Sequence, residues 1–281
     1  MVIGRALFRV LLAAIRYGLA LLIAFVMILP FLWMLGTSFK PIDETVRFPP
    51  TFIPEHPVGL ANYVTVMTRV PFARYFANST VTAIAVTTGA LLTSALAGYI
   101  FAKFTFTGRD LLFFLIVATM MVPFQVVLIP IFLMARALGL YNTLWALIVP
   151  GLVSAWGIFL MRQNMKHLPS ELLDAARIDG SSEMGIFLFV VLPLVKPALA
   201  ALGIFAFMAN WNSFLWPLIV IEDAPKRTLP LGLALFSSGF GITRWNLVMA
   251  ATVLTCLPVL VVFAIAQRSF IEGITLGSVK G

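Results

Sequence analysis

Residues 17–36 read YGLALLIAFVMILPFLWMLG and contain no Asp, Glu, Lys, Arg or His. An α-helix rises about 1.5 Å per residue, so a run of this length reaches across the roughly 30 Å hydrocarbon core of a bilayer. The composition is too apolar for a surface helix of a soluble domain. The stretch therefore predicts a helix that spans a membrane.

Similar runs recur along the rest of the chain. Of the 281 residues, 61% are hydrophobic and only 11% are charged, whereas a soluble domain carries about 25% charged residues. Inside a bilayer every backbone polar group must be bonded within the chain, which favours helices. We expect an all-α integral membrane protein with six transmembrane helices at about 17–36, 76–102, 111–134, 142–161, 198–221 and 247–266.

Charge near the first span indicates its orientation. Arg5, Arg9 and Arg16 precede it without an acidic residue, and such basic clusters favour the cytoplasmic side. No small-residue cleavage site follows the first run, so we expect it to be kept as a helix. This gives a cytoplasmic segment 1–16, a transmembrane domain 17–272 and a cytoplasmic tail 273–281, with both termini inside.

The sequence offers no energy source or catalytic centre of its own. The six spans contain no ionisable Asp, Glu, Lys, Arg or His, although proton- and ion-driven carriers usually keep such groups at membrane depth. The phosphate loop of ATPases and the common hydrolase motifs are missing from the sequence. His56, His167 and Cys256 are too scattered for a metal site. We therefore expect no catalysis and no metal, and a pump built on this chain would take its energy from another subunit.

The cytoplasmic loop 163–197 contains a short charged helix. Pro169 and Ser170 suit a helix start, and Gly180 suits its end because glycine accepts the left-handed conformation. Ser181 or Ser182 could cap a second helix, which we expect Pro193 to break.

The charge of that first helix favours a protein partner. It carries Glu171, Asp174 and Asp179 against Arg177 alone. Helices that lie on lipid headgroups are usually rich in Lys and Arg, so an amphipathic helix resting on the bilayer is the less favoured alternative. Leu172, Ala175, Ala176 and Asp179 are expected on one side, where the two alanines leave room for close approach.

Several motifs resemble those of one family. The triplet Asp174-Ala175-Ala176, then Gly180, then Leu192-Pro193, resembles the coupling motif of ABC importer membrane subunits. SALAGYIFAKFTFTGRD at 94–110, WNSFLWPL at 211–218 and QRSFIEGITLGSVKG at 267–281 are similar to the carbohydrate-uptake branch, in particular the second permease subunit of maltose-type importers.

The resemblance implies a type I permease with a cytoplasmic coupling helix, in the cell membrane of a prokaryote. Its implied partners are the bilayer, a homologous second permease, two copies of an ATPase subunit and an extracytoplasmic sugar-binding protein, with no nucleic acid. ATP and Mg²⁺ would bind the ATPase subunits, and this chain would bind no cofactor. Asp174 stands where the family motif has Glu. The implied ATPase-coupling residues are Glu171, Asp174, Ala175, Ala176, Gly180, Gly273, Gly277, Lys280 and Gly281.

Polar and aromatic residues in two spans are candidates for the solute path. Amides both donate and accept hydrogen bonds, and aromatic faces suit the C–H surfaces of sugars. The same residues could instead bond between helices or lie at the bilayer interface. The candidates are Gln125, Asn210, Trp211, Asn212 and Trp216. We expect half of a translocation pathway for a sugar or related polyhydroxylated solute, the alternatives being a passive channel and a secondary carrier without an ATPase partner.

Overall fold

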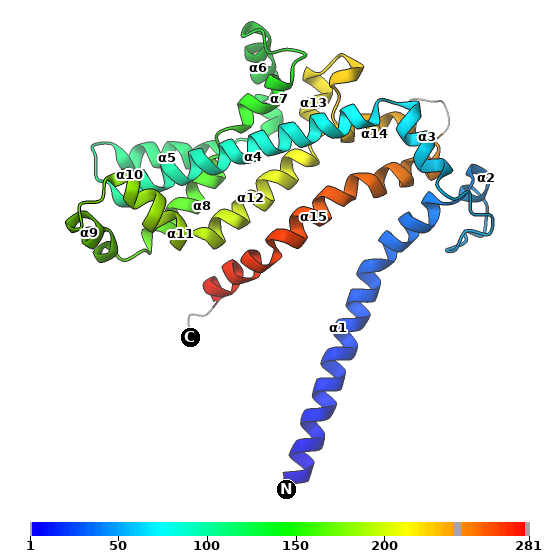
Figure 1. Ribbon diagram of the computed structural model, residues 1–281, viewed down its shortest axis with the longest axis horizontal. Helices are drawn as coiled ribbons and strands as arrows, with labels where there is room; N and C mark the ends of the chain where they lie inside the picture. Colours follow the sequence, from blue (N-terminus) through cyan, green and yellow to red (C-terminus); the bar gives the residue numbers. More distant parts are fainter. Residues whose placement is uncertain (1, 239–242, 279–281) are drawn as a thin grey trace. The chain divides into compact units, whose positions relative to one another are not determined.

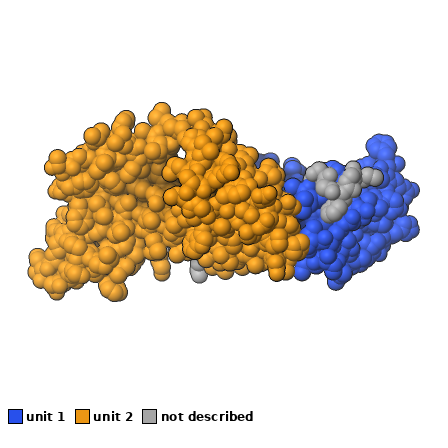
Figure 2. Space-filling model, turned by 90° about the horizontal axis from the view of Figure 1, so that it is seen from above, with its two compact units in different colours: residues 1–70, 233–256 blue, residues 71–232, 257–281 orange. Residues whose placement is uncertain are grey.

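The computed structural model describes residues 2–238 and 243–278, and in these ranges it contains helices and connecting segments but no strand (Figure 1). The chain divides into two compact units (Figure 2). Unit 1 comprises residues 1–70 and 233–256, and unit 2 comprises residues 71–232 and 257–281. We describe each unit by itself.

Unit 1 begins with the long helix α1 (Val2–Ser38), followed by α2 (Ile42–Thr45) and α3 (Ala61–Arg69). It also contains most of α14 (Leu229–Ser238) and the first turns of α15 (Trp245–Ser278). Asn62 of α3 joins these elements. Its amide donates to the backbone oxygens of Ser38 and Lys40, each at 2.8 Å, and its oxygen accepts from Asn246 at 2.9 Å. One buried amide therefore holds the end of α1, α3 and the start of α15 together.

Unit 2 is organised around α4 (Phe72–Lys103), which lies along α8 (Ala155–Lys166) and α12 (Lys196–Trp211) (Figure 1). Glycines permit the close contact. A Cβ on Gly98 would lie 2.6 Å from the Cβ of Met161, and one on Gly157 would lie 2.3 Å from the Oγ of Ser94. Small residues allow helix backbones to approach in membranes, where dispersion contacts drive association. This packing surrounds a core that includes Ala95, Tyr99, Met161, Met165 and Leu202.

The remaining elements of unit 2 are shorter. They are α5 (Arg109–Thr119), α6 (Phe124–Ala137), α7 (Leu144–Ile148), η1 (Val149–Gly151), α9 (Ser170–Ile178), α10 (Glu183–Ile186), η2 (Phe187–Val191), α11 (Leu192–Leu194), α13 (Leu215–Val220) and η3 (Ala224–Lys226).

Four helical segments within the described ranges are long and apolar enough to span a membrane: 11–38, 72–103, 144–166 and 245–265. Two further pairs pass the same test but are bent, α5 with α6 by 100° and residues 183–194 with α12 by 80°. The expected span 111–134 is thus divided by a bend that ends at Pro123, since the residue before a proline disfavours the helical conformation. Six spans result if each bent pair counts as one.

The span expected at 198–221 has different bounds in the structure. Helix α12 ends at Trp211, and the helical segment that forms a bent pair with α12 is residues 183–194, which precede it in the chain. The break expected at Pro193 lies instead at Val195. The segment before the proline is the π-helical η2. Wider π turns relieve the clash between a proline ring and the preceding carbonyl groups, so the helix continues through Leu194.

Candidate coupling site and solute groove

One side of α9 packs against the buried core of unit 2. Leu173 is 2% exposed and belongs to the same buried cluster as Met165, Tyr99 and Ile186, and Ala176 packs against that cluster. The cluster contains residues of α4, α8, η2 and α12. A force applied to α9 would therefore reach several membrane helices through packed side chains.

The ends of the two short helices agree with the sequence expectation. Gly180 has φ of +81°, and the amide of Ser181 donates to the carbonyl of Ala176 at 3.0 Å, which closes α9. The Oγ of Ser182 accepts from the amide of Gly185 at 3.2 Å and caps α10. The turn between α9 and α10 is thus defined by local hydrogen bonds.

Three charged side chains form a network across this turn. Arg177 donates to Asp174 Oδ1 at 2.7 Å and to Glu183 Oε1 at 2.7 Å, and Tyr99 donates to Glu183 Oε2 at 3.1 Å. The hydrogen bonds from Arg177 to Glu183 and to Asp174 raise the pKa of the guanidinium above its usual range. The motif acid Asp174 is therefore already paired within its own helix, yet its side chain remains 63% exposed.

The outer side of α9 and the turn is exposed and partly apolar. Glu171, Leu172, Ala175 and Asp179 are exposed, whereas Ala176, which was expected on the same side as Leu172, is half-buried. The sequence argument did not single out the exposed apolar side chains of α9 and the segment after it: Ile178 at 86%, Met184 at 55% and Phe189 at 80%. Exposed apolar side chains next to charged groups are typical of protein contacts.

The residues predicted at the end of the chain are only partly described. Helix α15 continues through Gly273 and Gly277 to Ser278. Lys280 and Gly281 lie outside the described residues.

The two tryptophans proposed for the solute path are packed in the protein. Trp211 is 1% exposed and stacks on Phe207 with ring centroids 5.5 Å apart. Trp216 is 8% exposed, and its Nε1 donates to the carbonyl of Ala146 at 2.9 Å. This geometry favours a packing role for both indoles.

The three amides lie in different surroundings. Asn210 is half-buried, and Asn212 and Gln125 are exposed. Asn210 and Asn212 each donate to a carbonyl of their own helix, Ala206 at 3.0 Å and Met208 at 2.9 Å. The structure does not bring the five predicted residues together into one site.

Asn210 lines a groove of about 440 Å³ within unit 2. Exposed aromatic rings form part of its wall, with Trp156 and Phe205 edge-to-face at 5.6 Å. Sequence reasoning missed this pair because the two rings come from α8 and α12, and only the fold brings them together. The lining residues are Val86, Ala90, Gly151, Val153, Ser154, Trp156, Leu202, Phe205, Ala206, Ala209 and Asn210.

These features define a class of protein. Apolar side chains on α1 and α15 are exposed, for example Leu21 at 71% and Leu260 at 58%, and lipid would cover them. No group of metal-ligating side chains occurs among the residues that the structure describes. Helices that span a bilayer, a groove among them and an exposed charged helix joined to the same core characterise a membrane permease.

Comparison with known proteins identifies the family. The profile described as "Binding-protein-dependent transport system inner membrane component" matches residues 91–275. The chain belongs to this family, and it is a non-catalytic permease subunit of an ABC importer.

Two relatives match over nearly the whole chain, and a third matches over about three quarters of it. The arabinooligosaccharides transport system permease protein AraQ of Halalkalibacterium halodurans is 38% identical over 92% of this chain and 93% of its own length. The lactose transport system permease protein LacG of Rhizobium radiobacter is 37% identical over 95% of this chain and 96% of its own. The sn-glycerol-3-phosphate transport system permease protein UgpE of Pectobacterium atrosepticum is 42% identical over 73% of each chain.

A solved structure shares the fold. A chain of a bacterial ABC transporter involved in the import of the acidic polysaccharide alginate superposes with a TM-score of 0.82 at 22% identity, covering 92% of this chain and 96% of that chain.

Proposed function

We propose that this permease forms half of the translocation pathway for a sugar or related polyhydroxylated solute. An extracytoplasmic binding protein delivers the solute, and a homologous second permease supplies the other half. The names of the relatives support the solute class, since they specify arabinooligosaccharides, lactose and glycerol 3-phosphate. A binding-protein partner is supported by the alginate transporter, which is described in complex with a periplasmic protein at a TM-score of 0.62.

In this proposal α9 is the coupling helix. Two copies of an ATPase subunit bind ATP and Mg²⁺, and one of them receives the exposed face that includes Glu171, Asp174 and Ala175. The observation that carries the proposal is the combination of an exposed, charged outer face with the buried anchor Leu173. An interface contact at Asp174 would move the packed cluster behind α9, because close-packed interiors transmit displacement.

The orientation follows from the same assignment. The coupling loop and both chain ends face the cytoplasm of a prokaryotic cell, and the tail residues Gly273, Gly277, Lys280 and Gly281 contribute to the ATPase contact. The groove on unit 2 faces the solute, with Asn210 as a hydrogen-bonding group and Trp156 and Phe205 as the apolar surface. Ordinary ligand pockets measure about 300–1,000 Å³, and the 440 Å³ groove lies in that range.

The test is a charge reversal at the coupling face. Asp174→Lys should abolish ATP-dependent uptake in proteoliposomes that contain all subunits, because the proposed ATPase contact would then meet a cation in place of the carboxylate of Asp174. Loss of one partner of a buried ion pair costs about 3–5 kcal/mol, and we expect a loss of this size in the binding free energy of the ATPase subunit. Copurification of the ATPase subunit should fall in parallel, while membrane insertion stays normal.

Asp43→Lys is the matched control, since Asp43 is also exposed but belongs to unit 1. Its uptake should be unchanged. Normal uptake by Asp174→Lys would refute the coupling assignment, and wild-type uptake that persists without ATP would refute the importer itself.

A further inference from the structure

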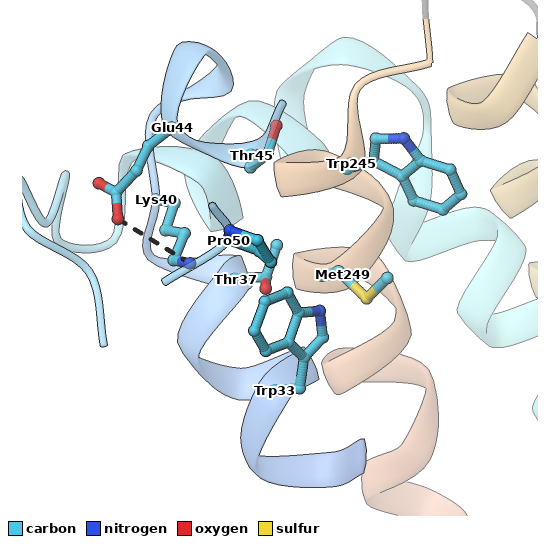
Figure 3. Close-up of a pocket in the computed structure, with 8 residues that line it drawn as sticks. All are labelled: Trp33, Thr37, Lys40, Glu44, Thr45, Pro50, Trp245 and Met249. Atoms are coloured by element: carbon cyan, nitrogen blue, oxygen red, sulfur yellow. Dashed lines mark ion pairs between the residues drawn. The ribbon is translucent and has the colours of Figure 1, made fainter. Parts of the chain in front are cut away.

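Unit 1 contains a pocket that the proposed function does not use. It measures about 240 Å³ and lies where the end of α1, the segment 40–50 and the start of α15 meet (Figure 3). Its lining residues are Trp33, Thr37, Lys40, Glu44, Thr45, Pro50, Trp245 and Met249. All eight belong to unit 1.

One polar group in the pocket lacks a partner. Thr37 is 5% exposed, and its Oγ1 has no hydrogen-bond partner among the described residues. Figure 3 shows this oxygen directed toward the ring of Trp33. Buried hydroxyl groups are normally hydrogen-bonded, so an unpaired one in a pocket indicates a place for a ligand hydroxyl.

The charged groups of the pocket balance each other. Lys40 Nζ lies 3.9 Å from Glu44 Oε1, and the two side chains are 2% and 4% exposed. The carboxylate also accepts from Thr51 Oγ1 at 3.0 Å and from the amides of Glu55 and His56 at 3.0 and 3.3 Å. Burial alone would raise the pKa of Glu44, but these hydrogen bonds and the Lys40 charge lower it below its usual value.

A balanced ion pair selects against charged ligands. An anion drawn to Lys40 would meet the ionised Glu44 within the same pocket, and a cation drawn to Glu44 would meet Lys40. Lys40 is further occupied by the carbonyl and hydroxyl of Thr51. A neutral ligand with hydroxyl groups fits this wall without disturbing the pair.

The rest of the lining is mainly apolar and aromatic. It consists of Trp33 on α1, Trp245 on α15, Pro50 and Met249. In Figure 3 the indole of Trp33 lies beside Thr37, whereas the indole of Trp245 is directed away from both. Trp33 is held edge-to-face against Phe52 at 4.9 Å, with Lys40 Nζ 5.0 Å from its ring centre. Indole faces pack well against the C–H surface of a saturated ring.

We propose that this pocket binds a single neutral sugar ring, through the indole of Trp33 and the hydroxyl of Thr37, with Trp245 as a further lining residue on α15. The volume lies below the range of drug-sized sites, which limits the ligand to one ring. Such a ring can come from a soluble sugar or from the headgroup of a neutral glycolipid. The pocket shares no lining residue with the groove on unit 2, so the inference does not depend on the proposed transport function.

The experiment reads the two indoles directly. The full-length chain is labelled with 5-fluorotryptophan and placed in phosphatidylcholine nanodiscs, and its ¹⁹F resonances are assigned with Trp33→Phe and Trp245→Phe. Methyl β-D-galactopyranoside is then titrated to tens of millimolar, with glycerol and galacturonate as acyclic and charged comparisons. We expect the Trp33 and Trp245 resonances to shift with one saturating curve for the galactoside alone, while Trp145 of unit 2 stays unchanged.

A second arm separates the two sources of the ring. Nanodiscs that contain monogalactosyl diacylglycerol are compared with phosphatidylcholine alone. If the ligand is a lipid headgroup, the glycolipid shifts both resonances without added sugar and then blocks the response to the galactoside. If it is a soluble sugar, only the titration moves them.

Two substitutions test the hydroxyl. Thr37→Val should weaken binding about fivefold, the loss expected for one hydrogen bond, whereas Thr37→Ser should retain the wild-type affinity. Thr87→Val is the matched control, because the Oγ1 of Thr87 is also buried without a partner among the described residues but does not line this pocket. Failure of both the galactoside and the glycolipid to shift the two indole resonances, or equal affinities in Thr37→Val and the wild type, would overturn the proposal.

Discussion

Two charge networks of similar chemistry lie in opposite environments. In unit 1, Lys40 pairs with Glu44, and both side chains are almost fully buried. In unit 2, Arg177 pairs with Asp174 and Glu183. The side chain of Arg177 is 40% exposed, that of Asp174 is 63% exposed and that of Glu183 is 47% exposed. Each network links two neighbouring segments, yet only the second remains open to water.

The difference in burial indicates which of the two networks can bind a partner protein. Charges removed from water must be satisfied inside the protein, so Lys40 and Glu44 hold a fixed structure around the pocket. Exposed pairs contribute about 0–1 kcal/mol, so the Arg177 network can exchange its contacts at little cost. Burial thus makes the first network structural and leaves the second available for docking.

The largest expected effect comes from breaking the buried pair. Glu44→Gln keeps the shape of the side chain but leaves the Lys40 ammonium buried without its counter-charge. We expect a loss of about 3–5 kcal/mol in the free energy of unfolding, measured by denaturant unfolding in mild detergent.

The matched control is Asp43→Asn, because Asp43 is the exposed neighbour in the same short helix. It should change the free energy of unfolding by less than about 0.5 kcal/mol. Equal stabilities of Glu44→Gln and Asp43→Asn would show that the buried pair is not structural.

Acidification should remove part of the same stabilisation. The pKa of Glu44 is lower in the folded protein than its ordinary value. Its contribution is therefore fully present above the unfolded pKa and is lost as the pH falls through the folded pKa. Unfolding curves recorded from neutral to acidic pH should show a steeper loss in the wild type than in Glu44→Gln, and parallel curves would contradict the assignment.

Local features could be predicted from the sequence. The apolar run 17–36 lies within α1, and Gly180 and Ser182 close and cap helices as expected. Each of these features depends on residues within a few positions of one another. Hydrophobic runs and capping residues act over that range, so the sequence alone contains the required information.

Features that depend on tertiary contacts could not be predicted from the sequence. The indoles of Trp211 and Trp216 are buried against residues distant in sequence. Their aromatic chemistry led us to expect a solute site, whereas in the fold they pack against other helices. Lys40 and Glu44 have helical spacing, but their burial requires segment 51–56 to close over them.

A smaller effect is expected at the turn that displays the exposed network. Gly180 has φ of +81° with open space around its Cα. In Gly180→Ala the side chain meets no clash, so the cost of about 1 kcal/mol comes from the left-handed backbone alone. Unfolding measurements should show that loss, and Gly139→Ala offers a comparison at φ of +69° away from the turn. An unchanged stability in Gly180→Ala would mean that the turn adopts another conformation.

The smallest stability effect is expected for the exposed network itself. Arg177→Gln removes the hydrogen bonds to both Asp174 and Glu183, yet these pairs lie in water and should cost less than about 1 kcal/mol. Uptake should respond more strongly than stability, because Asp174 loses the contact that orients it on α9. Arg177→Lys, which keeps the charge but not the two-sided fork, should retain the stability and recover only part of the uptake. A large loss of stability in Arg177→Gln, comparable with that of Glu44→Gln, would erase the contrast between the buried and the exposed network.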